Sequence, residues 1–143
     1  MDVIVNLDDW FVSQLSELRC TDDTKAYVTG VLTKFKCNTQ GDMSHESIVL
    51  AFNDARISGD FKSYQRIGDW VLFIDVIVPD AIKHHRKSVE TIGQLSYSSC
   101  HKLMLGRWLV FEELAERLPG LSREARSRLR TTAVKRPSGI IVP

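Results

Sequence analysis

The chain has 143 residues, of which 43% are hydrophobic and 26% are charged, and its formal net charge is +1. This composition is typical of one soluble globular domain that is long enough to bury a core without disulfides. It excludes a disordered chain, a collagen-like repeat and a disulfide scaffold.

The small net charge hides two halves of opposite sign. Residues 1–60 contain five Lys and Arg against ten Asp and Glu, whereas residues 61–143 contain fourteen against eight. Six basic residues and one acidic residue lie between positions 120 and 143. A basic patch is therefore expected near the end of the chain.

No segment has the pattern of an export signal or a membrane span. The N-terminus lacks a basic region followed by a long apolar run. The most apolar run, 70–78, is interrupted by Asp75 and is far shorter than the roughly 20 residues that a spanning helix needs. The three cysteines form no CxxC pair, which argues against a zinc ribbon or a thioredoxin-like site. We expect a reduced, cytoplasmic protein.

Apolar residues recur at helical spacing along three segments of the first sixty residues. The first helix is expected over about 6–19, with Asn6 as its N-cap, and the second begins after Thr21. A loop over 38–43 follows. Ser44 is the expected N-cap of a third helix, which stops at Gly59.

The segment 61–78 fits two structures. Its apolar residues follow a helical stripe, but the run 70–78, between Gly68 and Pro79, also has the composition of a buried strand. Only the short run 140–142 is available to pair with it, and an isolated strand leaves its backbone groups unsatisfied. The sequence therefore predicts a helix here.

Punctuating residues divide the rest of the chain. A basic turn over 83–87 precedes Ser88, which is the expected cap of a fifth helix. A sixth helix is expected to end at Pro119, and Ser122 is expected to cap a short basic helix. The predicted fold class is thus all-α, a single-domain bundle of six or seven helices over residues 1–130 with an irregular basic tail over 131–143.

Motifs for catalysis and metal binding are missing from the sequence. His84, His85, Glu90 and His101 are the candidate metal ligands, but adjacent helical residues point about 100° apart and lysines and arginines surround the first two. For the same reason Cys100 and His101 do not form a catalytic pair. No glycine-rich phosphate loop is present. We expect no enzyme activity, no metal and no cofactor.

Two aspartates, Asp69 and Asp75, lie in the most hydrophobic stretch of the chain. A buried carboxylate is costly unless it is paired. Asp75 is therefore expected to contact an arginine, a backbone donor or solvent, in a structural ion pair and not in acid–base catalysis.

The basic segment near the end of the chain resembles a helix-turn-helix in outline, although Pro119 breaks the spacing of the usual turn. The candidate residues for binding a partner or a nucleic acid are Arg123, Arg126, Arg128, Arg130, Lys135 and Arg136. Two alternatives stay open beside nucleic-acid binding. The segment is either a solvated basic helix, or it docks on the acidic first half of this chain or of a neighbouring subunit.

Several short motifs in the middle of the chain resemble those of one family. The motifs are Ser-Tyr-Gln-Arg-Ile-Gly-Asp-Trp-Val-Leu-Phe-Ile at 63–74, Pro79-Asp80, the segment 88–103 with Gly93 and Tyr97, and Val-Phe-Glu-Glu-Leu-Ala at 110–115. They are similar to a family of uncharacterised all-helical bacterial proteins, over about residues 27–118. Asp80 stands where that family has Glu. The resemblance implies a helix over 61–78 but no known activity, catalytic residue or cofactor.

These observations predict a non-enzymatic protein that works through protein–protein contact, as an accessory or structural subunit or by self-association. The alternative is a nucleic-acid-binding protein that uses the basic segment 121–136.

Overall fold

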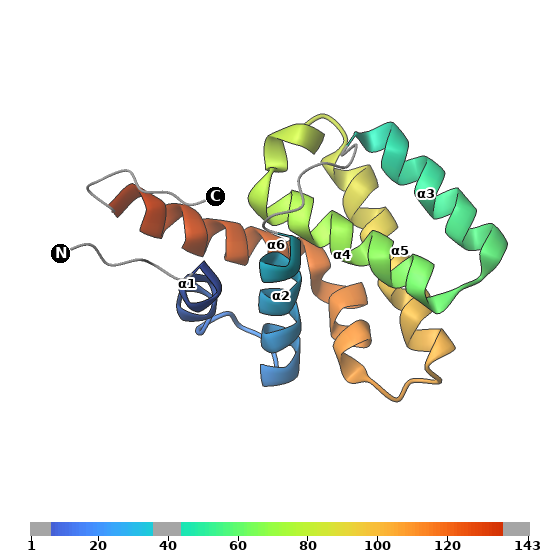
Figure 1. Cartoon of the computed structure of the whole chain (residues 1–143), viewed down its shortest axis with the longest axis horizontal. Helices are drawn as coiled ribbons and strands as arrows, with labels where there is room; N and C mark the ends of the chain where they lie inside the picture. The colour runs from blue at the N-terminus through green and yellow to red at the C-terminus, as the bar shows by residue number, and fades with distance from the viewer. Residues whose placement is uncertain (1–6, 36–43, 136–143) are drawn as a thin grey trace.

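The computed structural model describes residues 7–35 and 44–135 of the chain (Figure 1). Within them lie six α-helices, namely α1 (Leu7–Gln14), α2 (Asp22–Phe35), α3 (His45–Ser58), α4 (Phe61–Ile77), α5 (Arg86–Leu103) and α6 (Leu109–Lys135). A 3-10 turn, η1 (Pro79–Ile82), joins α4 to α5. The predicted all-α bundle is confirmed.

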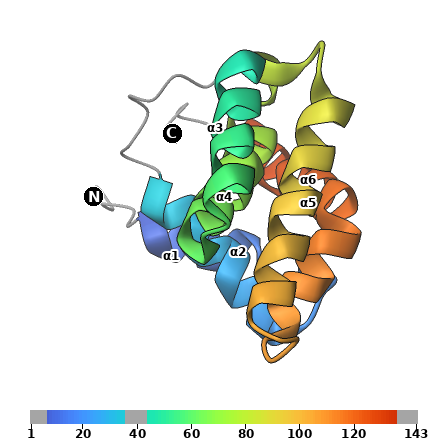
Figure 2. The same cartoon turned by 90° about the vertical axis from the view of Figure 1, so that its right-hand side faces the viewer.

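Helix α4 lies at the centre of the bundle and contacts α2, α3, α5 and α6. Figure 2 shows α3 and α5 side by side in front of it. Between Ile67 and Val76 every residue of α4 except Trp70 is buried. A helix that is apolar all round belongs inside a domain, which explains why the run 70–78 also had the composition of a buried strand.

Two glycines let α4 and α5 approach closely. A Cβ atom on Gly68 would lie 2.8 Å from Cε1 of Tyr97, and one on Gly93 would lie 2.7 Å from Cγ1 of Val71. Both distances are shorter than a carbon–carbon contact allows. These positions belong to the motifs that resemble the bacterial family, and in this fold they serve packing.

The predicted helix boundaries are partly right. Ser44 caps α3, since its Oγ accepts from the Ser47 N–H at 3.1 Å, and Gly59 ends α3 in the left-handed conformation. However, α1 ends at Gln14 and not at residue 19, because the chain tightens into turns there. Helix α5 begins at Arg86, before Ser88, because η1 leads directly into it.

The largest correction concerns Pro119, where the sixth helix was expected to stop. Helix α6 continues through Pro119 to Lys135, so the predicted turn and the Ser122 cap are wrong, and the first five residues of the predicted tail are helical. A proline has no N–H for the carbonyl four residues earlier. Here Nε2 of Gln94 donates to that carbonyl, on Ala115, at 2.9 Å.

Helix α6 also has a reason to continue beyond Pro119. The apolar stripe of its first half is extended by buried residues at helical spacing, namely Leu118, Leu121, Ala125 and Leu129. Figure 1 shows that the helix bends in its middle, between the orange and the red halves. A bend at this place is the usual effect of an internal proline.

Some predictions fall outside the described residues. These are the Asn6 cap, the loop over 38–43, the run 140–142 and the end of the tail from 136 onward. Among the helices described, none contains an apolar stretch sufficient to cross a membrane.

Candidate functional site

The arginines of the predicted basic segment do not share one face. Arg126 points into the bundle, where its Nη1 donates to the backbone oxygen of Asp75 at 2.6 Å and to Oδ1 of Asp75 at 3.2 Å. Arg123 and Arg130 are exposed. Lys135 ends α6 but its side chain lies outside the described part, as does Arg136.

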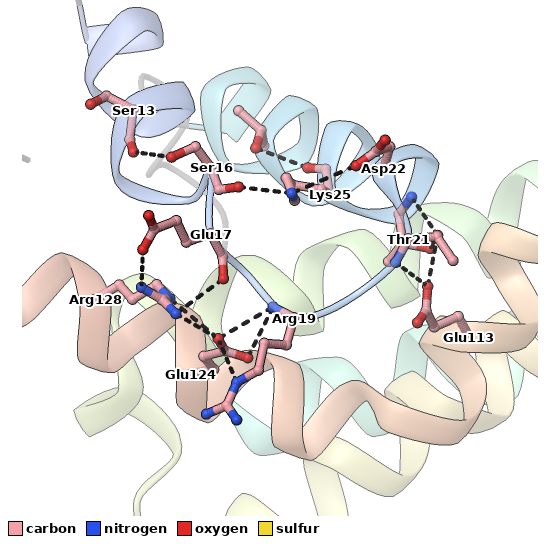
Figure 3. Close-up of polar contacts among 12 residues, drawn as sticks. Ser13, Ser16, Glu17, Arg19, Thr21, Asp22, Lys25, Glu113, Glu124 and Arg128 are labelled. Carbon is pink, nitrogen blue, oxygen red and sulfur yellow. Dashed lines mark hydrogen bonds and ion pairs between the residues drawn. The ribbon is translucent and has the colours of Figure 1, made fainter.

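Arg128 serves the connection between α1 and α2, residues 15–21, which we call the N-terminal link. Its Nε and Nη2 bind Oε2 of Glu124 at 3.2 and 3.0 Å, and Nη2 also donates to the backbone oxygen of Glu17 at 3.0 Å (Figure 3). For this residue, the expected docking of the basic segment on the acidic first half occurs within the chain.

Along the N-terminal link, three basic side chains donate to backbone oxygens that a helix would otherwise bind. Lys25 Nζ donates to the oxygen of Ser16 (2.7 Å), Arg128 Nη2 to that of Glu17 (3.0 Å) and Arg117 Nη2 to that of Arg19 (2.7 Å). Backbone carbonyls need hydrogen-bond partners when they leave a helix. The three cations supply those partners, so the link is ordered without a helix or strand.

Two glutamates of α6 bind the N–H groups of the same link (Figure 3). The Arg19 N–H lies 3.3 Å from each carboxylate oxygen of Glu124, and Glu113 Oε1 accepts from the N–H and hydroxyl of Thr21 at 3.2 and 2.9 Å. Burial by itself would raise the pKa of Glu124. The hydrogen bonds from Arg128 and the Arg19 backbone outweigh it and hold that pKa below its usual value.

Asp75 is fully buried and lies in an ionic cluster between α4, α5 and α6, whose arginines are partly exposed. Its Oδ1 is 3.2 Å from Nη1 of Arg126 and 3.5 Å from Nε of Arg86. Glu90, only 9% exposed, lies beside it, and burial followed by the hydrogen bond to Asp75 raises the pKa of Glu90 to about 7. The expected contact between Asp75 and arginine is present. Through these ion pairs the cluster connects three helices, α4, α5 and α6.

A second buried carboxylate, Asp69, has no arginine beside it. Its Oδ1 accepts from the hydroxyls of Tyr27 on α2 and Tyr97 on α5, both at 2.7 Å, and Gln65 donates to the Tyr27 hydroxyl at 3.0 Å. Burial raises the pKa of Asp69 despite these bonds. Sequence reasoning missed this centre, because the two tyrosines are 42 and 28 residues away from Asp69.

The histidines do not form a metal site. His85 stacks on His45 with ring centroids 4.1 Å apart, and His101 Nε2 lies 3.8 Å from Glu112. His84 is exposed. Across residues 7–35 and 44–135 no three His, Cys, Asp or Glu side chains are placed to hold a metal ion.

The cysteines in the described part are not activated for chemistry. Burial raises the pKa of Cys100 to about 12 and that of Cys20 to about 11, so both are thiols at neutral pH. Cys37 lies outside the described residues.

Exposed apolar side chains gather at the turn between α5 and α6. They are Leu103, Leu105, Trp108 and Leu109, which we call the apolar corner. Their exposed fractions are 48%, 79%, 38% and 64%. The sequence patterns used above did not predict this corner. The cluster of four large apolar residues within seven positions is the signal that indicates it.

Comparison of the chain with family models, with curated proteins and with solved structures finds no match. The similarity to a bacterial family remains a prediction from the sequence motifs. Functional proposals for this chain therefore come from its own residues.

Proposed function

We propose that this protein acts by binding another protein molecule and not as an enzyme, and that the apolar corner is its contact surface. Leu105 carries the proposal. It has a φ of 56°, in the left-handed region, and its side chain is 79% exposed. A non-glycine residue in that region costs roughly 1–2 kcal/mol, and this leucine buries little in return.

The turn itself does not require a leucine. Helix α5 ends through the Gly106 N–H, which donates to the oxygen of His101 at 2.9 Å, and through the Leu105 N–H, which donates to the oxygen of Lys102 at 3.0 Å. Glycine or asparagine at position 105 makes the same backbone bonds with less strain. A strained, exposed leucine supports a role outside the fold.

Trp108 supplies an ordered aromatic group next to Leu105. Its ring packs edge to face on Phe111, with centroids 4.9 Å apart, and on Tyr27, at 5.7 Å. The ring is thereby held in place while 38% of the residue stays exposed. A rigid aromatic side chain loses little entropy on binding, which is why such residues dominate protein interfaces.

Exposed charged residues adjoin the corner along the chain, namely Lys102, Arg107 and Glu112. A polar rim around an apolar centre is the usual anatomy of a protein interface. Since two of the three charges are basic, an apolar partner surface with acidic edges is the best complement.

Self-association is the first test of this proposal. Light scattering during gel filtration measures the mass of the wild-type protein, of Leu105→Asp and of Leu50→Asp as a matched control. Leu50 is similarly exposed, at 65%, but lies on α3. We expect an oligomer that Leu105→Asp dissociates and Leu50→Asp leaves intact.

If the wild-type protein is a monomer, a photo-crosslinking side chain at position 105 identifies a different protein partner in the cells that make it. The same side chain at position 50 is the control. Adducts formed only from position 105 support the proposal. A monomer that gives no adduct from position 105, or the same adducts from both positions, would refute it.

Nucleic-acid binding through the segment 121–136 is the second candidate function. The exposed Arg123 and Arg130 favour it, while Arg126 and Arg128 are engaged within the chain. It predicts an affinity for DNA or RNA that falls steeply with salt and that an Arg123→Ala, Arg130→Ala double variant lowers. Absence of binding at low salt would dismiss it.

A further inference from the structure

We propose that a hollow beside α6 binds a compact, multiply charged anion, of the kind formed by a di- or triphosphate group. The hollow has a volume of about 720 Å³. Four arginines, Arg19, Arg117, Arg123 and Arg128, line it together with one acid, Glu124. We call it the arginine hollow. The proposal is independent of the apolar corner and concerns a different surface.

The shape of the hollow follows from residue spacing on α6. Gly120, Arg123, Glu124, Ser127 and Arg128 are three to four residues apart, so they share one face of the helix. The small residues at 120 and 127 leave space between the longer side chains. Arg117 from the preceding turn and Arg19 from the N-terminal link complete the wall.

Three of the four arginines, namely Arg19, Arg117 and Arg123, retain donors that the described part of the chain does not use. Nη1 of Arg117 donates to Oε2 of Glu113 at 2.9 Å, and its Nη2 donates to the backbone oxygen of Arg19. A guanidinium carries five N–H donors, so most of those of Arg117 remain. The Arg19 side chain is 85% exposed. Arg123 is exposed and has no hydrogen bond or ion pair with any other part of the chain that the structure describes.

Glu124 does not cancel this positive charge. Its carboxylate accepts from the Arg19 N–H and from Arg128, and it lies 3.6 Å from Nε of Arg19 (Figure 3). One negative charge thus orients two arginines. Arg117 is paired with Glu113, whereas Arg123 brings a positive charge that forms no ion pair with the described residues. Prepositioned guanidinium groups recognise phosphate oxygens through paired hydrogen bonds.

The grouping of four arginines around one hollow favours a compact anion over a nucleic acid. A nucleic acid presents phosphates along a line and is best met by cations along a helix or groove. In this protein Arg126 turns inward and Arg130 lies outside the hollow, while four arginines line one hollow. A single carboxylate brings one negative charge, so it offsets less of the positive charge of several guanidinium groups than a di- or triphosphate does.

The test uses the full chain and inorganic tripolyphosphate at low salt, with NMR to locate the site and calorimetry to measure the affinity. We expect saturable binding with shifts of the amide signals of α6 and the N-terminal link. Arg123→Ala is expected to weaken binding about tenfold, which is the loss of one charge-assisted hydrogen-bonded contact. Arg123 has no hydrogen bond or ion pair to lose within residues 7–35 and 44–135, so its variant reports on the ligand.

Arg130→Ala is the matched control, since it removes the same charge from the same helix but outside the hollow. We expect less than about a twofold change for it. Inorganic phosphate, pyrophosphate and ATP then show whether the phosphate chain alone is recognised or whether an organic group adds affinity. Leu105→Asp is expected to leave binding unchanged, which separates this proposal from that of the apolar corner.

Three results would overturn the proposal. The first is absence of saturable tripolyphosphate binding. The second is equal weakening by Arg123→Ala and Arg130→Ala, which indicates attraction by overall charge. The third is tighter binding of a short DNA or RNA that depends on both arginines, which assigns the surface to nucleic acid.

Discussion

Two regions of α4 each bury an aspartate, and they bind its carboxylate in different ways. Asp69 and Asp75 lie six residues apart on one helix and are 4% and 0% exposed. Asp69 is bound by the uncharged hydroxyls of two tyrosines, whereas Asp75 is bound by two arginines and adjoins Glu90. Each centre ties α4 to α5, but the first reaches α2 and the second reaches α6.

The difference shows how the surroundings decide the charge state of a buried acid. Hydroxyl donors do not offset the loss of water around Asp69, so its pKa is raised. Around Asp75, two guanidinium groups supply full positive charges, and the neighbouring Glu90 is the acid whose pKa rises. We therefore expect the Asp75 region to depend on charge and the Asp69 region to depend on hydrogen bonding.

The largest effect is expected from Asp75→Ala. Removing the carboxylate leaves Arg126, whose side chain is 16% exposed, buried without its counter-charge. Breaking a buried ion pair in this way costs about 3–5 kcal/mol of unfolding free energy, measurable by urea denaturation. Asp80→Ala, at an exposed aspartate just beyond α4, is the control. A loss below about 1 kcal/mol would show that the arginines find other partners.

Tyr97→Phe tests the hydrogen bond at the other centre. The variant keeps the ring, which stacks on Phe111 with centroids 5.9 Å apart, and removes only the hydroxyl that Asp69 accepts from. Removing a hydrogen-bond donor from a buried acceptor costs about 1–3 kcal/mol. We expect a loss in that range by urea unfolding. No change in stability would mean that the tyrosine serves packing alone.

Glu90→Gln tests the pH dependence of the Asp75 region. Burial, and then the hydrogen bond and charge of Asp75, raise the pKa of Glu90 from 4.5 to about 7. Between these values the folded state holds more protons than the unfolded state, so stability falls as pH rises, by up to about 1.4 kcal/mol per pH unit. Unfolding free energies at several pH values should fall more steeply in the wild type than in the variant, since Asp69 contributes equally to both. Parallel pH profiles would contradict it.

Asp69→Asn is expected to have the smallest effect at neutral pH. The amide oxygen can accept from both tyrosine hydroxyls, and the neutral amide avoids the cost of a buried charge. We expect a change within about 1 kcal/mol. Because the raised pKa of Asp69 makes the wild type less stable as pH rises, the variant should gain relative to it at higher pH. A loss as large as that of Asp75→Ala would show that the two centres do not differ as described.

Much of the fold follows from local patterns in the sequence. The apolar periodicity predicted the helices, and Ser44 and Gly59 marked the ends of α3 because caps depend on neighbouring residues alone. Pro119 misled the prediction, since the donor that replaces its missing N–H comes from Gln94, on another helix. A partner distant in sequence leaves no trace in local spacing.

The candidate sites were less predictable for the same reason. The hydrophobic surroundings of Asp75 indicated an arginine, a backbone donor or solvent as its partner, but which arginines reach it depends on how α5 and α6 pack. Arg126 and Arg128 looked alike in the sequence, and the fold directs one into the core and the other to the N-terminal link. The positive φ of Leu105, which singles out the apolar corner, is a property of the folded turn.

We expect the bend at Pro119 to separate α6 into two halves that open independently of each other. The half before the bend is tied to α5 through Gln94, while the half beyond it carries Arg126 together with Glu124 and Arg128, which bind residues 17 and 19 of the N-terminal link. The two halves of α6 are separated by one missing backbone hydrogen bond, the one that Pro119 cannot donate. Proteins open in cooperative units whose borders fall where such ladders are interrupted. Amide hydrogen exchange should therefore report two levels of protection along this one helix, with residues 121–130 exchanging together with the link and residues 110–118 exchanging with the central bundle.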